Sequence, residues 1–335
     1  MEVKMYNGKR VFLVINTGYF GDTLLTSKLT SDIKKEYPDS FLLFLVDAPY
    51  LDVAKGLPGV DEVIIYNRKQ HRKFIPFIKF IMKFPYKNKI DVAFVAQRKK
   101  TSRNILAKIL GSKRVFCFAT FSDSNTCNEF KAKNHLNKRF AHQLANLLSY
   151  LTGKETDNQD IKYFVPKLAQ EKIDKYLKSL NLQNNLVAIN PQASSDWKCW
   201  DVNEVVKLVK LLIKDGKKVI LTGVLKDGPQ YVYALDSQIG AGNYLNMVDE
   251  TNIPELAALY KRCEAVVSVD TGSMHMACAV GTPTIAIFFR EDYELWGPLN
   301  NKKNPYIYSP GGLSAEIVHD KILEYSKNLS KLYSN

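Results

Sequence analysis

The sequence lacks any apolar run long enough to cross a membrane. Every apolar stretch is shorter than the roughly 18 residues that a bilayer-spanning helix requires. The first ten residues are polar, so no secretory signal peptide is predicted. Cysteine is scarce as well: the five residues are odd in number, and no two have metal-ligand or CxxC spacing. A reduced, cytoplasmic compartment is therefore expected.

Two widespread nucleotide-binding motifs are also missing. The Gly-containing turn in residues 16–26 carries G-x-x-G-D and lacks the first glycine pair of the dinucleotide-binding fingerprint. No G-K-S or G-K-T follows it, so the turn is not a P-loop. No D-x-D pair of carboxylates stands near the motifs described below, and neither a metal nor a cofactor is predicted.

Acidic residues are almost absent from residues 68–114. This segment holds fifteen Lys and Arg and a single acid, Asp91, which gives it a net charge of +14. The whole chain carries +13, so the remainder is close to neutral at −1. Such a concentrated basic region is typical of a surface that binds phosphates or an anionic membrane. The alternative is a solvated basic face without a ligand.

The 335 residues, 46% hydrophobic and 24% charged, are enough for about two soluble domains. Short β-rich apolar runs alternate with helical patterns, which predicts an α/β fold with parallel sheets. Residues 152–160 are polar and lack an apolar period. We therefore predict one domain over residues 1–162 and a second over residues 163–335. A terminal helix at 313–332 packs either on its own domain or back on the first.

The most informative stretch is residues 265–289, which predicts a buried strand, a polar turn, a small-residue helix from Met274 to Val280 and a second strand. Ligands bind at the carboxyl ends of parallel strands. The turn places Asp270, Thr271, Gly272 and His275 at such an end, and free N–H groups at the helix start suit a phosphate. The alternative is that these residues only cap and pack the helix.

Three further polar segments follow predicted strands. Asp22 lies in the turn after the first strand, where a helix cap is the alternative role, and this turn leads into a single predicted helix of about four turns that ends near Tyr37. A basic loop is predicted over residues 97–103, after the strand at 90–96, and its Arg98, Lys99 and Arg103 suit an anionic acceptor. The loop at 191–200 follows the strand at 186–190. Its Ser194, Ser195 and Lys198 offer phosphate donors and a cation.

Together these motifs resemble the heptosyltransferase family, glycosyltransferase family nine. The D-T-G-x-x-H-x-A-x-A-x-G-x-P-T run at 270–284 and the G-x-x-G-D run at 18–22 are similar to its signatures. The loop at 191–200 resembles its G-A-S-x-x-K-x-W, with Gln192 in place of Gly and Asp201 in place of the following Pro. Residues 291–298 resemble its closing D-x-x-L-W-G-P, although Arg290 and Glu291 replace the usual Gly-Pro.

The resemblance implies a GT-B architecture, with two facing Rossmann-like domains and a cleft between them. It implies an inverting, metal-independent transfer of a sugar, most often heptose from ADP-heptose, to a lipopolysaccharide or lipooligosaccharide core. The nucleotide-sugar is a co-substrate, and no other cofactor is implied. The anionic, phosphorylated glycolipid acceptor implies peripheral contact with the cytoplasmic face of the inner membrane, and no nucleic acid is expected as a partner.

The same resemblance assigns roles to residues of this chain. Asp22 becomes the catalytic base. The donor-binding residues are Ser194, Ser195, Lys198, Asp270, Thr271, Gly272 and His275. The residues expected to bind the acceptor are Gly21, Arg98, Lys99 and Arg103.

Residues 73–84 predict an apolar, aromatic helix on which Lys79 and Lys83 share a face. The helix either packs on the sheet as a crossover or also touches an anionic membrane with its basic edge and exposed aromatics.

Other functions stay open at this stage. A nucleotide-sugar epimerase on the same fold leaves the basic region unexplained, and a glycosyltransferase with another donor needs the same site. A non-catalytic nucleic-acid-binding protein uses the basic region, but no recognisable nucleic-acid module is present.

Overall fold

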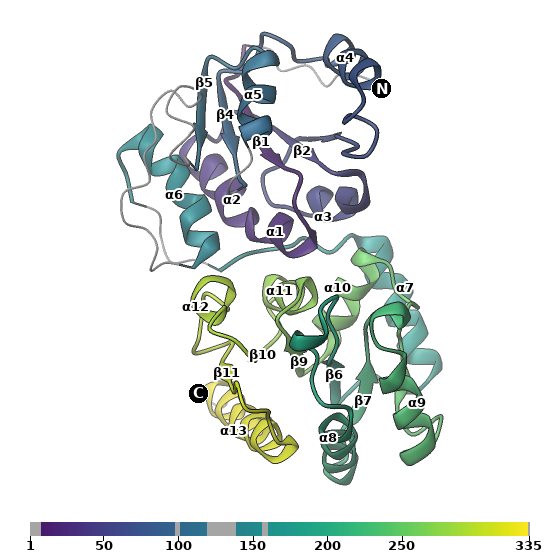
Figure 1. Ribbon diagram of the computed structural model, residues 1–335. Coiled ribbons are helices and arrows are strands. Elements are labelled where there is room, and N and C mark those ends of the chain that lie inside the picture. Colours follow the sequence, from purple (N-terminus) through teal and green to yellow (C-terminus); the bar gives the residue numbers. More distant parts are fainter. Residues whose placement is uncertain (1–7, 98–100, 119–138, 156–159, 334–335) are drawn as a thin grey trace. The chain divides into compact units, whose positions relative to one another are not determined.

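The computed structural model describes residues 8–97, 101–118, 139–155 and 160–333, without the side chains of residue 101 and residues 326–333 (Figure 1). The chain divides into two compact units, Met1–Phe164 and Val165–Asn335. We call them the N-terminal and C-terminal units. The division falls two residues after the boundary expected at residue 162.

The N-terminal unit is built on a parallel five-stranded sheet in the order β3-β2-β1-β4-β5. Its strands are β1 (Val11–Asn16), β2 (Phe41–Val46), β3 (Glu62–Ile65), β4 (Val92–Val95) and β5 (Arg114–Cys117). All six residues of β1 and of β2 are buried, as in strands covered by helices on both faces. The chain runs outward from β1 to β2 on one side and resumes with β4 on the other. The edge between β1 and β4 is therefore a topological switch point.

Six α-helices of the described residues accompany this sheet. They are α1 (Phe20–Leu25), α2 (Ser27–Glu36), α3 (Leu51–Lys55), α4 (Phe74–Lys83), α5 (Thr101–Ile109) and α6 (Phe140–Thr152). Apolar strand faces and helix stripes meet in a core that includes Leu13, Leu43 and Leu106, all buried. The fold of this unit thus follows from burial of the strands rather than from any single helix.

The prediction of a single helix after the first strand is wrong in one respect, because this segment forms two helices, α1 and α2, which are separated at Thr26. The cause is the buried side chain of Asn16. Its Nδ2 donates to the Asp22 carbonyl at 3.0 Å and to Thr26 Oγ1 at 2.7 Å, and Thr26 Oγ1 donates to the same carbonyl at 2.9 Å. Side chains that take a helical carbonyl in this way interrupt the helix ladder.

The C-terminal unit has a parallel six-stranded sheet in the order β11-β10-β9-β6-β7-β8. Its strands are β6 (Leu186–Asn190), β7 (Lys218–Leu221), β8 (Leu245–Asn246), β9 (Ala265–Val269), β10 (Thr284–Phe288) and β11 (Tyr306–Tyr308). Its α-helices are α7 (Lys167–Ser179), α8 (Val202–Lys214), α9 (Pro229–Gln238), α10 (Ile253–Arg262), α11 (Gly272–Ala279), α12 (Tyr293–Trp296) and α13 (Ala315–Tyr333). Here the switch point lies between β6 and β9.

The first half of α13 packs on the C-terminal unit itself. Leu313, Ala315, Val318 and Ile322 are buried in one core with Ile285 of β10. The described side chains of the terminal helix therefore pack on their own domain, which is one of the two predicted placements.

Two further features of the structure concern the cysteines and the apolar character of the helices. Cys199, Cys263 and Cys278 are free thiols, whereas Cys117 at the end of β5 is disulfide-bonded. No helix in the described ranges is both long and apolar enough to span a bilayer.

Candidate functional site

The polar side chains singled out in the sequence lie at the carboxyl edges of the two sheets, within the described part of the chain. In the N-terminal unit they surround the switch point between β1 and β4, and in the C-terminal unit the one between β6 and β9. Each unit thus carries one candidate site.

Asp22 is the third residue of α1, and its side chain helps to cap the first turn of this helix, which is the alternative role expected for it. Its Oδ2 accepts a hydrogen bond from the Tyr19 amide at 3.1 Å, which folds the carboxylate back over the turn. A Cβ atom at Gly18 would lie 2.5 Å from this oxygen, so a side chain there would displace the carboxylate. Gly21 precedes Asp22 in the first turn of α1. The G-x-x-G-D motif therefore shapes a backbone turn against which one carboxylate rests.

Burial raises the pKa of the Asp22 carboxyl, and the Tyr19 amide and the nearby Arg68 guanidinium oppose this shift. A carboxylate with a raised pKa is a stronger base than an ordinary surface carboxylate. The arrangement therefore suits Asp22 to accept a proton from a bound hydroxyl group.

Arg68 belongs to this site, although no individual role is predicted for it from the sequence. It follows β3, and its Nε donates to Asp47 Oδ2 at 2.5 Å while its backbone amide donates to Asp47 Oδ1 at 3.0 Å. Its guanidinium also lies over the Tyr19 ring, 5.7 Å from the centroid. Its position directly after a short strand was the available signal, because such positions reach the carboxyl edge.

Arg103 lies on the same side of the N-terminal unit. Its Nε donates to Thr17 Oγ1 at 2.8 Å, and its guanidinium carbon stands 4.5 Å from the Tyr66 ring centroid. Thr17 in turn donates to Gln97 Oε1 at 2.9 Å, across the ends of β1 and β4. Arg103 is on α5 and not on a loop, which corrects the loop predicted over residues 97–103. Arg98 and Lys99, the other two basic residues predicted to bind the acceptor, lie outside the described residues.

In the C-terminal unit Lys198, Asp270 and His275 come together from two loops and a helix. Lys198 Nζ forms an ion pair and hydrogen bond with Asp270 Oδ2. Burial, with a smaller effect from the Lys198 charge, lowers the pKa of His275 to about 3. The imidazole is therefore neutral near pH 7, so this edge has one lysine already paired with a carboxylate and a histidine without charge.

The start of α11 adds groups that fit an anion. Thr271 is its N-cap residue and Gly272 its first residue. The Thr271 Oγ1 atom is buried and has no hydrogen-bond partner, an arrangement that proteins rarely leave unused. The helix begins two residues earlier than the start expected at Met274, so its free N–H groups come directly after β9.

The loop after β6 holds the remaining predicted donor residues. Ser194 is exposed and Ser195 half-buried, and neither hydroxyl bonds to another described side chain. Asp201 caps α8 by accepting from the Asn203 and Glu204 amides at 2.8 and 3.2 Å. This N-cap accounts for an Asp at the position where the family motif has Pro.

The other departure in this loop is Gln192. Its buried side chain fills the space left by two glycines, because a Cβ atom at Gly223 or Gly228 would collide with its amide. A buried Trp200 closes the loop, with its indole N–H donating to the Leu313 carbonyl at 2.8 Å.

Residues 87–319, more than two thirds of the chain, match the family described as glycosyltransferase family 9 (heptosyltransferase). The chain belongs to glycosyltransferase family 9. The resemblance inferred from the D-T-G and G-x-x-G-D motifs is thereby confirmed, and the protein is an enzyme of the glycosyltransferase class.

Relatives of this glycosyltransferase cover most of its length. It is 25% identical to lipopolysaccharide heptosyltransferase 3 of Escherichia coli over 289 residues, which cover 84% of each protein. The structure of a family 9 glycosyltransferase from Veillonella parvula has a TM-score of 0.83 at 16% identity, covering 97% of this chain and 98% of that one. An Escherichia coli heptosyltransferase solved with ADP has a TM-score of 0.75 at 19% identity, covering 94% and 99%. The predicted pair of Rossmann-like, parallel-sheet units of the GT-B class is confirmed.

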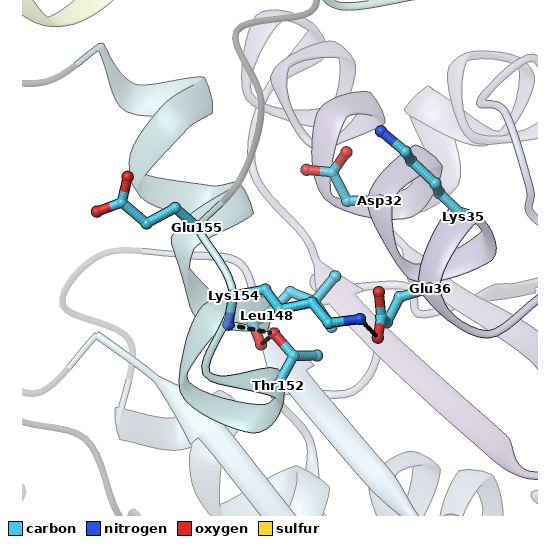
Figure 2. A pocket seen from close by; sticks show the side chains of 7 residues that line it. All are labelled: Asp32, Lys35, Glu36, Leu148, Thr152, Lys154 and Glu155. Atoms are coloured by element: carbon cyan, nitrogen blue, oxygen red, sulfur yellow. Dashed lines mark hydrogen bonds and ion pairs between the residues drawn. The ribbon is translucent and has the colours of Figure 1, made fainter.

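A separate cavity lies between α2 and α6 of the glycosyltransferase (Figure 2). Lys154 reaches across it to Glu36, with 2.5 Å between Nζ and Oε1. Because α2 ends at Glu36 just before β2 begins, this cavity is at the amino edge of the sheet, opposite Asp22. It therefore takes no part in the candidate site. Across the described ranges, no three His, Cys, Asp or Glu side chains are grouped to hold a metal ion.

The electrostatics of Asp22 can be tested without an activity assay. In carboxyl ¹³C NMR titrations, assigned with the Asp22→Asn variant, we expect the Asp22 pKa to lie above the ordinary value of about 3.9. Replacing Arg68 with Gln should raise this pKa further, because a positive charge that favours the carboxylate is lost.

Two controls separate charge from shape in this titration. Arg68→Lys keeps the charge and should leave the Asp22 pKa close to its starting value. Arg68→Gln leaves the Asp47 carboxylate without its partner. The double variant Asp47→Asn with Arg68→Gln removes this unpaired carboxylate as well. An unchanged Asp22 pKa in Arg68→Gln would show that Arg68 does not act on this carboxyl.

Proposed function

We propose that this glycosyltransferase moves a heptose from ADP-heptose to the core of a lipopolysaccharide-type acceptor, with inversion at the anomeric carbon and without a metal ion. The observation that carries the proposal is the likeness to lipopolysaccharide heptosyltransferase 3 over 84% of both chains. The similar Escherichia coli heptosyltransferase solved with ADP supports an adenine nucleotide as donor. The side chains at the carboxyl edges of both sheets suit these roles.

In the proposed reaction Asp22 acts as the general base. The acceptor hydroxyl loses its proton to the Asp22 carboxylate while its oxygen attacks the anomeric carbon of the donor. The bond between that carbon and the β-phosphate oxygen breaks, and its electron pair leaves on ADP. Attack on the face opposite ADP inverts the configuration. The raised pKa of Asp22 supports this role, since it makes the carboxylate a better proton acceptor.

The C-terminal unit binds the donor and stabilises its leaving group. Negative charge grows on the diphosphate as the sugar departs, and preorganised donors lower the energy of that charge. Lys198, the unpaired Thr271 hydroxyl and the first amides of α11 supply such donors. Asp270 holds Lys198 in place before the donor arrives. Ser194, Ser195 and the neutral His275 orient the sugar and phosphates.

The N-terminal unit binds the acceptor. Arg103 and Arg68 place two guanidinium groups at the edge that carries Asp22 and Gly21, and Arg is suited to bidentate contact with phosphate or carboxylate. The roles predicted for Arg98 and Lys99 in the same region stay part of this proposal. The basic segment 68–114 thus serves a transferase, which favours this function over the epimerase and nucleic-acid alternatives.

We further propose that α4 attaches the enzyme to the cytoplasmic face of the inner membrane. Phe74 is 77% exposed and Met82 75% exposed, and Ile75 and Ile78 are exposed between them. Lys79 and Lys83 are exposed on the same short helix. An exposed apolar face with basic neighbours is typical of a helix lying in an anionic bilayer surface.

The other side of α4 connects this surface to the acceptor residues. Ile81 is buried, and the Phe80 ring lies 5.2 Å from the Tyr66 ring and 4.7 Å from the His71 ring, between centroids. Tyr66 also carries the Arg103 guanidinium. In Figure 1, α4 lies at the margin of the N-terminal unit, apart from α1, α2 and α3. A glycolipid head group beside a docked α4 would therefore be close to Arg103.

A donor panel tests the reaction. We expect the protein to transfer sugar from ADP-heptose to a deacylated lipopolysaccharide-core acceptor, faster than from UDP- or GDP-sugars. NMR of the product should show an anomeric configuration opposite to that of the donor. EDTA should leave the rate unchanged. Transfer from none of the donors contradicts the proposed function, and activity lost in EDTA but restored by Mg²⁺ contradicts its metal-independent form.

The Asp22→Asn variant tests the base. It keeps the shape and can still accept from the Tyr19 amide, but it cannot take a proton, so we expect turnover to fall by about 10²- to 10⁴-fold with donor affinity unchanged. The matched control Asp39→Asn changes an exposed carboxylate at the amino edge and should keep full activity. Full turnover in Asp22→Asn would leave Asp22 only a structural role.

Vesicle flotation tests the membrane surface. The protein should bind vesicles containing phosphatidylglycerol at low salt, because each basic residue near the surface contributes about 1 kcal/mol. Phe74→Ser with Met82→Ser, and separately Lys79→Glu with Lys83→Glu, should each weaken this binding.

The matched control for charge is Lys175→Glu with Lys178→Glu, which makes the same change on the exposed face of α7. Activity towards the deacylated acceptor should persist in every one of these variants. Equal loss of binding in the α7 control, or no binding by the unmodified protein at low salt, would rule out α4 as the membrane contact.

A further inference from the structure

Arg290 stands at the carboxyl edge of the C-terminal sheet, two residues after β10 ends at Phe288. Its guanidinium carbon is 4.0 Å from the centroid of the Trp197 ring, a stacked cation–π contact. Lys198 Nζ lies 5.1 Å from the same ring. One indole, 41% exposed, therefore holds two cations that come from different loops.

The basic side chains at this edge differ in whether a neighbouring carboxylate already neutralises them. Lys198 is paired with Asp270, and His275 is neutral. Arg290 forms no ion pair with a carboxylate of the described residues. Stacking uses the face of a guanidinium and leaves its N–H edge free to donate. Among the described side chains at this edge, Arg290 thus brings a positive charge that no carboxylate neutralises.

Arg290 also lines a narrow, tightly packed cavity together with two candidate donor residues, Lys198 and Asp270. Trp197, Lys198, Asp270, Phe289, Arg290 and Asp292 all line it. The cavity joins the loop after β6, the turn after β9 and the end of β10, which are neighbouring strands of one sheet. A diphosphate at the start of α11 would need more positive charge than a lysine already paired with a carboxylate supplies.

We propose that Arg290, held in place by Trp197, binds the diphosphate of the nucleotide-sugar donor and stabilises it as the leaving group. This inference rests on the proposed function of the C-terminal unit and adds a residue to it. Arg290 replaces a residue of the Gly-Pro pair that is usual in glycosyltransferase family 9. The contact between Arg290 and Trp197 therefore distinguishes this chain from that usual pattern. Trp197 is a positioning residue that presents the guanidinium edge to the phosphates.

The experiment measures ADP binding by calorimetry at low and high salt, and adenosine binding by ligand-observed NMR, on the full-length protein. Arg290→Ala should weaken ADP binding by about 10- to 100-fold, as expected for a lost hydrogen bond between charged groups. It should also reduce the salt dependence of ADP affinity and leave adenosine binding unchanged. Arg290→Lys should recover part of the affinity, because it restores the charge without the stacked, bidentate geometry.

Trp197→Leu tests the positioning role. It should weaken ADP binding in the otherwise unmodified protein and have a smaller effect in the Arg290→Ala background, where only its contact with Lys198 remains. The matched control is Arg262→Ala, which removes an arginine from the opposite edge of the same sheet, where it pairs with Asp174. This control should bind ADP as the unmodified protein does, and unchanged melting temperatures should exclude unfolding in all variants.

The outcomes separate this inference from the proposed function. If the unmodified protein binds ADP and Arg290→Ala binds it equally well, the role of Arg290 is overturned while the donor site stands. If Trp197→Leu weakens adenosine as strongly as ADP, the indole contacts the base and its positioning role is overturned. If the unmodified protein binds neither ADP nor UDP, GDP or CDP, the donor site itself is refuted, and Arg290 with it.

Discussion

The structure depends on the burial of both faces of its parallel strands. All six residues of β1 and all five of β9 are buried, so these segments leave no room for polar chemistry along their length. Their backbone groups are satisfied by neighbouring strands, and polar side chains collect where the strands end. Asp22 and Asp270 both stand after such an end. The chemistry of each unit is therefore confined to one edge of its sheet.

Each edge is held ready by pairing that exists before any ligand is present. In the N-terminal unit the buried Asn16 amide fixes the turn, since it binds the Gly18 amide, the Asp22 carbonyl and the Thr26 hydroxyl. In the C-terminal unit Asp270 holds Lys198, and Trp197 holds Arg290. Side chains that are fixed in advance lose little entropy when a ligand binds. The same contacts that stabilise the loops would therefore also prepare them for the ligands proposed above.

The basic segment divides into parts with different physical roles. Arg68 is matched by Asp47 and Arg103 is tied to Thr17, so these two arginines are fixed beside the Asp22 turn. Lys113 pairs with Asp91 at the opposite edge and contributes to the fold. Lys79 and Lys83 stay exposed beside the apolar face of α4. The segment with a net charge of +14 thus includes two arginines beside the Asp22 turn, a structural ion pair and a surface helix.

The sequence by itself determined the two α/β units, the strands at their centres and the turns that follow them, because continuous apolar runs and polar turns are local signals. It also determined the family, through Asp22 in G-x-x-G-D and the run from Asp270 to Thr284. It could not show that Arg68 meets Asp47, that Arg290 stacks on Trp197, or that Asn16 divides the first helix. Those contacts join side chains far apart in the chain or bent back on a turn, and only the register of the parallel strands decides which of them meet.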